Sequence, residues 1–224
     1  MTPATWPCPL PAGGAAREYA LVFDRGRQHR LLILPALFDE SNRLRRFTVE
    51  VMRRLDAAGI DGFLPDLPGC NESLQPLEQQ DTTDWTDAAT AAARHFDATH
   101  ALGIRGGCLF TPAGLPVWHY APAKASSILR QMMRARILSA REAGREETRE
   151  LLAEMAVVSG IELSGYPIGA DFFRHFEKMA PDPRATVIAQ DALGGSGLWT
   201  RAEPDENSAQ ADALAAIVIA GIAR

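Results

Sequence analysis

Short apolar runs alternate with stretches of helical periodicity along most of this chain. The run at 100–104 predicts a buried strand, whereas Leu44, Phe47 and Val51 recur at the spacing of one helix face. Strands are expected at 19–23, 30–34, 63–64, 100–104, 115–120, 185–189 and 198–201, with a strand or extended segment at 161–163. Helices are expected at 41–58, 84–96, 106–111, 123–143 with a continuation to 155, 170–179 and 207–222. This alternation predicts an α/β fold with parallel strands and right-handed crossovers.

The beginning of the chain follows a different pattern. Residues 1–16 hold four prolines and two adjacent glycines, which predict a loop or a partly disordered segment. Asp24-Arg25-Gly26-Arg27 separates the apolar runs 19–23 and 30–34, which indicates two antiparallel strands joined as a hairpin. We therefore expect an antiparallel start to a mostly parallel sheet.

The composition excludes several classes of function. Apolar residues make up 46% and charged residues 23% of 224 residues, as in folded soluble proteins, and the length suits one domain over 1–224. The net charge of -5 comes from 28 acidic and 23 basic residues, a balance that argues against nucleic acid as the partner. Neither a signal peptide nor an apolar run of about 18 residues occurs, so no membrane span is expected.

The cysteines indicate neither a disulfide framework nor a zinc site. Cys8, Cys70 and Cys108 are odd in number and show no C-x-x-C spacing. This usage suits a reducing compartment, so we expect a cytoplasmic protein without metal or cofactor. Cys108 lies shortly after the strand expected at 100–104, and we expect its thiol to face the core rather than to react.

The most informative segment chemically is Gly103-Ile104-Arg105-Gly106-Gly107. It has the glycine spacing of G-x-S-x-G, the sharp strand-to-helix turn that presents a nucleophile at the carboxyl end of a parallel strand. The first and last glycines are needed because the turn leaves no room for a Cβ atom. The middle position holds Arg105, whose guanidinium stays protonated and has no nucleophilic lone pair.

The other members of a Ser-His-Asp triad are incomplete as well. A histidine is expected after the last strand, but residues 198–204 contain none, whereas Asp191 follows the penultimate strand, where the triad carboxylate belongs. Loss of nucleophile and base together typically removes about 10⁶ in rate. Triad hydrolysis is therefore not expected. Asp191 and His119 remain the candidates for a catalytic role, although a strand-end histidine such as His119 is more often a hydrogen-bonded structural residue.

Arg105 also suggests a binding function. It would project from a helix N-terminus, where free N–H groups and the dipole favour an anion, and a guanidinium binds carboxylate or phosphate in two-pronged fashion. A small acidic metabolite or a phosphorylated lipid intermediate is therefore the ligand class to test. The alternative is an internal ion pair of Arg105 with Asp191, Glu203 or Glu40, without any ligand.

Several segments together resemble a known family, the exosortase A system-associated hydrolases of the second type. These segments are 31–46, 64–70, 103–107, 117–118, 128–136 and 162–166, and the likeness covers about residues 19–204. The resemblance implies an α/β-hydrolase-like, mostly parallel sheet flanked by helices, with a small or absent cap. It further implies a bacterial exopolysaccharide or protein-sorting system. Phe38, Glu40, Asn42 and Arg46 match the family's loop beside the elbow, so they join Arg105 and Gly106 as candidate ligand-binding residues.

Three hypotheses of function follow. The first is a pseudoenzyme, a hydrolase fold that binds an anionic small molecule or a protein of the polysaccharide or sorting machinery without turnover. The second is an active hydrolase or esterase with a non-standard site, in which Asp191, Glu40 or His119 activates water. The third is a scaffold that forms a homodimer through exposed helices of the region 123–155.

Overall fold

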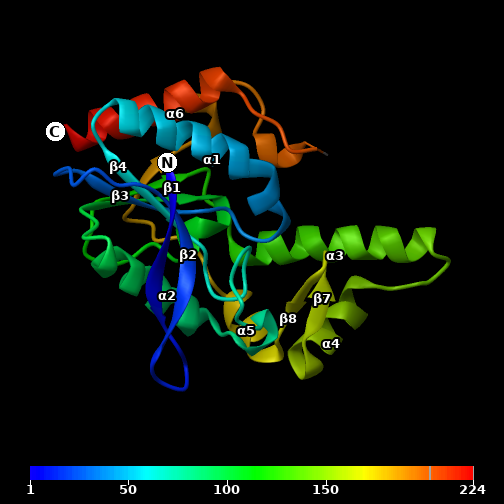
Figure 1. The fold of residues 1–224 in the computed structure, drawn as a ribbon. Helices are drawn as coiled ribbons and strands as arrows, with labels where there is room; N and C mark the ends of the chain where they lie inside the picture. Colours follow the sequence, from blue (N-terminus) through cyan, green and yellow to red (C-terminus); the bar gives the residue numbers. More distant parts are fainter. Residues whose placement is uncertain (202, 224) are drawn as a thin grey trace.

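A seven-stranded sheet forms the centre of the protein, with strand order β1-β2-β4-β3-β5-β6-β9 (Figure 1). The computed structural model describes residues 1–201 and 203–223. The strands of this sheet are β1 (Thr2–Pro9), β2 (Ala15–Phe23), β3 (Arg30–Leu34), β4 (Asp61–Pro65), β5 (His100–Ile104), β6 (Val117–Tyr120) and β9 (Thr186–Ile188). β3, β4, β5, β6 and β9 run parallel, as predicted, while β2 is antiparallel to both β1 and β4.

The first strands differ from the sequence prediction in two ways. The segment expected to be a loop at 1–16 contains β1, where Trp6 and Cys8 alternate with exposed residues and are buried. Prolines are tolerated there because β1 is the edge strand, so a residue without an N–H can lie where no neighbouring strand needs that hydrogen bond. The predicted hairpin of 19–23 with 30–34 is wrong. β4 lies between β2 and β3, because its fully buried residues need neighbours on both sides.

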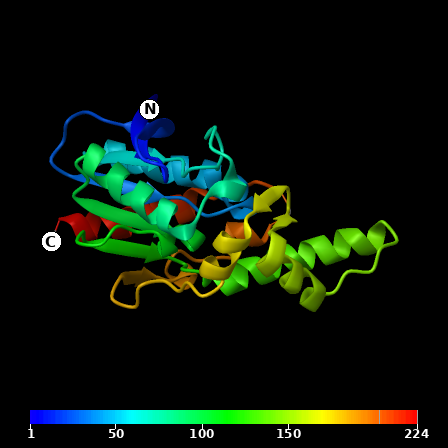
Figure 2. The ribbon, with the colours of Figure 1, turned by 90° about the horizontal axis from the view of Figure 1, so that it is seen from below.

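Helices cover both faces of the sheet (Figures 1 and 2). α1 (Asp39–Ala57) and α6 (Ser208–Ile222) pack side by side over one face. α2 (Thr82–His95) covers the other face, and Asp81 caps it through a reciprocal capping box with Asp84. Among the described residues, no helix combines the length and the apolar character needed to cross a bilayer.

The chain between β6 and β9 forms an insertion that extends beyond the sheet (Figure 1). Its elements are α3 (Ala125–Glu142), α4 (Arg149–Ser159), the antiparallel strands β7 (Ile161–Leu163) and β8 (Tyr166–Ile168), and α5 (Ala170–Phe176). The beginning of α3 and the hairpin lie close to the carboxyl ends of the central strands, while the far end of α3 projects into solvent (Figures 1 and 2).

Four short 3-10 turns complete the structure: η1 (Leu77–Gln79), η2 (Arg105–Leu109), η3 (Gln190–Ala192) and η4 (Leu198–Thr200). The strand predicted at 198–201 is wrong, because η4 occupies this segment. Gly194 and Gly195 both adopt positive φ just before it, so the chain turns rather than extends. The sheet therefore ends at β9 among the described residues.

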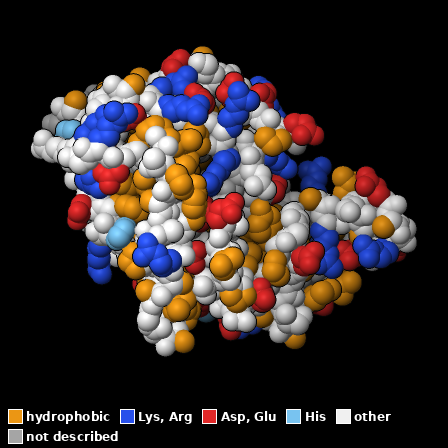
Figure 3. Space-filling view, in the orientation of Figure 1, with side chains coloured by type: hydrophobic (Ala, Val, Ile, Leu, Met, Phe, Trp, Pro, Cys, Tyr) orange, Lys and Arg blue, Asp and Glu red, His pale blue; other side chains and the backbone are white. Residues whose placement is uncertain are grey.

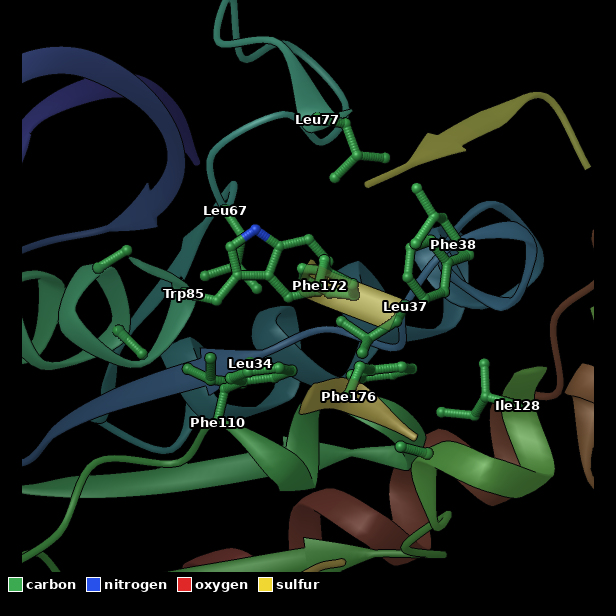
Figure 4. Packing of buried hydrophobic residues seen from close by; sticks show 14 of the residues in the cluster. Leu34, Leu37, Phe38, Leu67, Leu77, Trp85, Phe110, Ile128, Phe172 and Phe176 are labelled. Carbon is green, nitrogen blue, oxygen red and sulfur yellow. The ribbon is translucent and has the colours of Figure 1, made fainter. Parts of the chain in front are cut away.

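A cluster of aromatic rings joins α2, α5 and the loop after β3 (Figure 4). Trp85 lies in its middle, with ring centroids 4.8 Å from Phe172 and 5.2 Å from Phe110. Its indole N–H donates to the Pro68 carbonyl oxygen at 2.9 Å. Phe38 packs at the edge of this cluster, 5.9 Å from Trp85, so the core reaches directly under the carboxyl end of β3.

Glu18 on β2 is a buried carboxylate, 2% exposed, whose Oε1 has no hydrogen-bond partner among the described residues. Burial, together with the Asp66 carboxylate nearby, raises the pKa of Glu18. At pH values between the ordinary and the raised pKa, the folded protein therefore holds a proton on Glu18 more often than the unfolded chain does. Stability contributed by that proton is complete below the ordinary pKa of Glu and is lost as the pH rises through the raised value.

We expect Glu18→Gln to increase the free energy of unfolding by about 1 kcal/mol at pH 8, because a neutral amide is cheaper to bury than a carboxylate. The gain should shrink toward pH 4, where Glu18 is protonated. Urea unfolding of both proteins at the two pH values measures it. Glu177→Gln, at an exposed position, is the control and should change stability by less than about 0.5 kcal/mol. A gain independent of pH would contradict this explanation.

Candidate functional site

The predicted elbow forms at the carboxyl end of β5. The strand ends at Ile104, and Arg105 adopts φ 53°, the left-handed region that non-glycine residues rarely occupy. The glycines on either side allow close packing: a Cβ on Gly103 would lie 2.7 Å from Cys108 Cα, and one on Gly107 would lie 2.3 Å from the Leu34 carbonyl oxygen. The turn therefore has the tight strand-to-helix geometry expected from the glycine spacing.

Arg105 is held by three hydrogen bonds and one ring. Its Nε donates to Glu40 Oε2 at 3.0 Å and its Nη2 donates to Glu40 Oε1 at 2.9 Å, so the pair is bidentate. Nη1 donates to the Ala121 carbonyl oxygen at 2.9 Å. The guanidinium carbon lies 4.1 Å from the ring centroid of Trp199. The Arg105 side chain is 15% exposed and that of Glu40 is 3% exposed, so this ion pair is largely removed from water.

Of the three carboxylates considered as partners of Arg105, the structure selects Glu40. It stands in the first turn of α1, directly after the loop that follows β3. Asp191 does follow the last strand, in η3, but it is exposed and its carboxylate has no hydrogen-bond partner among the described residues. Glu203 is exposed as well. β3 and β5 are neighbours in the sheet, so their carboxyl ends bring Glu40 and Arg105 together.

Three strained residues surround this ion pair. Phe38, Arg105 and Ala121 have φ of 54°, 53° and 44°, and they follow β3, β5 and β6 respectively. Non-glycine residues in this region cost roughly 1–3 kcal/mol each and cluster at functional sites. The strain therefore marks the carboxyl edge of these three parallel strands as the candidate site.

The other predicted ligand-binding residues are divided between this site and its surroundings. Phe38 is 2% exposed and packs edge-on against Tyr166 of β8, at 5.3 Å between ring centroids. Asn42 is exposed and donates to the Tyr166 hydroxyl at 3.5 Å, so it lies at the rim. Gly106 is buried, with no room for a Cβ beside Leu37. Arg46 is 66% exposed and pairs with Glu206 rather than joining Arg105.

The hairpin of the insertion leaves little open space over the loop that follows β3. A cavity of about 10 Å³ lies between the loop after β3 and the hairpin, lined by Leu37, Phe38, Leu67 and Tyr166 among others. This is the room of about one water molecule. A substrate pocket in the ordinary sense would hold several hundred Å³. The hairpin of the insertion, through Tyr166, thus closes the space above Phe38.

His119 and Cys108 are buried away from solvent. His119 is 0% exposed, its Nε2 lies 3.0 Å from Thr111 Oγ1, and burial lowers its pKa. Cys108 is 2% exposed, and burial raises the pKa of its thiol. Cys108 therefore faces the core, as expected, and His119 is a hydrogen-bonded interior residue whose ring does not contact Arg105, Glu40 or Asp191.

Two residues of the site were missed by sequence reasoning. Trp199 lies in the segment predicted as a strand, and Ala121 contributes only its carbonyl oxygen, which no sequence pattern reveals. The only sequence signal for Trp199 is its place after the glycine-rich run 194–197, and this signal only weakly indicates that its ring covers the end of a strand. Among the described residues, no three histidine, cysteine or acidic side chains lie close enough together to hold a metal ion.

Comparison with known proteins agrees with this topology. No family model matches the chain, and no curated protein is similar to it in sequence. Among solved structures, it is similar to alpha/beta hydrolase domain-containing protein 10 from mouse, with a TM-score of 0.58 and 11% identity over 100% of this chain and 99% of that chain. It is also similar to proline iminopeptidase from Mycobacterium smegmatis, with a TM-score of 0.50 and 13% identity over 99% and 98%.

The match to one further hydrolase structure is shorter. Against a putative hydrolase from Agrobacterium vitis S4, the TM-score is 0.44 and the identity 16%; the match covers 62% of this chain and only 59% of that chain. At such identities the comparisons speak to the fold alone. Together with the strand order, the antiparallel β2 and the elbow after β5, they lead to one conclusion: the chain has the α/β-hydrolase fold.

Proposed function

We propose that this protein is a non-hydrolytic α/β-hydrolase fold that binds an anionic ligand or partner at its elbow. The observation that carries the non-hydrolytic part of the proposal is the guanidinium of Arg105 at the nucleophile position, held in a bidentate pair with Glu40, one of the internal ion pairs considered as the alternative to a ligand. A nucleophile there would need an adjacent base, and no histidine ring contacts this position. Asp191 and His119, the catalytic candidates, lie apart from one another, exposed in η3 and buried against Thr111 respectively.

The remaining hydrogen-bonding capacity of Arg105 supports the binding role. A guanidinium has five N–H donors, and three of them have partners among the described residues. The other two can donate to one carboxylate or phosphate group. Glu40 neutralises much of the charge of Arg105, so we expect only moderate affinity. An incoming group would also need Trp199 to move, because this ring covers the guanidinium and only 15% of the Arg105 side chain is exposed.

The resemblance to exosortase A system-associated hydrolases supports the biological setting of this proposal. In that setting the anion would be an intermediate of exopolysaccharide synthesis, or an acidic segment of a protein of the polysaccharide or sorting machinery. The protein itself would be cytoplasmic. An active hydrolase with a non-standard site is the alternative, and it needs a water-activating carboxylate with room for a substrate beside it.

A fluorophosphonate probe tests the absence of turnover. We expect no change in intact mass after incubation and no hydrolysis of short-chain esters, both for the wild type and for Arg105→Ser, because the variant gains a hydroxyl without a base. An adduct or ester turnover in the wild type would support the alternative, and peptide mapping would then locate the nucleophile. Any small-carboxylate or phosphate compound that stabilises the protein in a thermal-shift panel would be carried forward.

The binding half of the proposal is tested with matched variants of the ion pair. Glu40→Gln should tighten binding of such a compound by about tenfold or more, because the full charge of Arg105 becomes available. The double variant Glu40→Gln with Arg105→Gln removes both charges together and should abolish binding. Arg46→Gln on the outer surface of α1 serves as the control and should leave the affinity unchanged. An affinity equal in all four proteins would refute the role of Arg105.

A further inference from the structure

The arginines of the insertion differ from those in the rest of the molecule. Thirteen of the described arginines form ion pairs, among them Arg136 of α3, which pairs with Glu147. Seven of the described arginines have no ion-pair partner among the described residues. Five of these seven lie on α3, on α4 or between them: Arg130, Arg134, Arg141, Arg145 and Arg149.

This segment reverses the charge of the protein. Residues 124–159, which hold α3, α4 and the chain between them, carry seven basic and five acidic side chains, a net charge of +2, whereas the whole chain carries -5, which leaves -7 for the remainder. Like charges on one helix repel one another, so this set costs some stability within the isolated chain. A charge pattern of this kind is typical of a surface that meets an anionic partner.

The free arginines of α3 lie on one face. Arg130, Arg134 and Arg141, with Leu138 between them, follow spacings of four, four and three residues, so they share the side of the helix opposite its buried residues. This row is about 16 Å long at 1.5 Å per residue. Glu142, at the end of the helix, is the only acidic residue of α3. The face is thus basic along nearly its whole length.

Exposed aliphatic side chains accompany this basic row. Leu138 is 58% exposed at its centre, and Leu151 and Val158 on the neighbouring helix α4 are 50% and 80% exposed. Figure 1 shows that the end of α3 stands clear of the sheet, and Figure 3 shows basic, acidic and apolar side chains interspersed along the projecting part. The apolar side chains therefore stand on a protruding surface, not in a groove.

We propose that the basic face of α3, with Leu138 inserted, docks the protein onto an anionic phospholipid surface. Arginines and large aliphatic side chains on a protruding helix can engage lipid phosphates and enter the boundary of the acyl chains together. A second copy of the same chain is a poor occupant of this face, because pairing it with itself would bring basic residues against basic residues. The acidic remainder of the protein would stay away from the membrane, since the insertion holds it at a distance.

Vesicle co-sedimentation of the full chain tests the proposal. We expect binding to phosphatidylcholine vesicles that contain phosphatidylglycerol, no binding to phosphatidylcholine alone, and weaker binding as salt is added. Arg130→Glu with Arg134→Glu should reduce the binding constant about thirtyfold or more. Leu138→Ser should reduce it about three- to tenfold through lost insertion, with the salt dependence retained.

The control changes the net charge equally, at the two arginines outside the insertion that have no ion-pair partner among the residues that the structure describes. Arg17→Glu with Arg94→Glu should leave vesicle binding within about twofold of the wild type, because these side chains are not on the docking face. Circular dichroism checks that all variants keep their helices. Equal loss in both double variants, or no preference for anionic vesicles, overturns the proposal. Binding unaffected by Leu138→Ser and reproduced by soluble polyaspartate assigns the face to an acidic protein instead and overturns it too.

Discussion

Glu40→Ala is expected to lower the free energy of unfolding by about 3–5 kcal/mol, the range for removing one partner of a buried ion pair. The variant leaves the guanidinium of Arg105 between Trp199 and the Ala121 carbonyl oxygen, with only 15% of its side chain exposed and no carboxylate beside it. A guanidinium that stays buried without a carboxylate partner destabilises the folded state more than either a paired or an exposed one. Urea unfolding monitored by tryptophan fluorescence measures the change.

Two further proteins decide whether the loss comes from the unpaired charge. Glu40→Leu combined with Arg105→Met removes both charges and should recover most of the stability, since apolar replacements of a buried pair are often neutral or stabilising. Glu206→Ala breaks the ion pair of Glu206 with Arg46 of α1, whose side chains are 39% and 66% exposed, and it should cost less than about 1 kcal/mol. A loss below 1 kcal/mol in Glu40→Ala would mean that Arg105 finds water or another acceptor.

The second large effect is expected at the elbow itself. Gly107→Ala should cost about 3 kcal/mol or more, because its Cβ would lie 2.3 Å from the carbonyl oxygens of both Leu34 and Pro35. These atoms are backbone at the end of β3, so no side-chain rotation relieves the overlap. Relief requires η2 to move away from the loop after β3, which would also separate Arg105 from Glu40. Thermal unfolding should therefore occur at a lower temperature, while vesicle binding by the folded protein should be unchanged because α3 keeps its basic face.

Gly62→Ala provides the matched substitution in the same sheet. A Cβ there meets the Met52 side chain at 3.5 Å, an ordinary contact, and we expect a change of less than about 1 kcal/mol. Comparable losses at Gly62 and Gly107 would show that the close approach at the elbow is relaxed at little cost. The elbow would then be less constrained than the positive φ of Arg105 suggests.

The helices and the inner strands could be read from local patterns. β5 has the predicted bounds 100–104, and α2 at 82–95 lies within two residues of the helix predicted at 84–96, because apolar periodicity acts over a few neighbouring residues. The elbow was predictable for the same reason. Its glycines and Arg105 are adjacent in sequence, and the turn depends on steric limits within that short segment.

What depended on distant residues could not be read in this way. β1 was missed because its prolines indicated a loop. The pairing of strands depends on which buried faces meet, so β4 rather than β3 is the neighbour of β2. The same limit applied to the site. Sequence alone left Glu40, Asp191 and Glu203 as equal partners for Arg105, although they lie 65, 86 and 98 positions away from it.

By itself, then, the sequence determined an α/β chain with a sharp glycine turn and a guanidinium in place of a nucleophile. Only the tertiary structure decided that Glu40 binds this guanidinium, that Trp199 covers it and that His119 is buried against Thr111. The physical reason is the range of the interactions. Turns and helix caps are governed by neighbouring residues, whereas an ion pair, a stacked ring or a buried imidazole exists only where the sheet brings distant strand ends together.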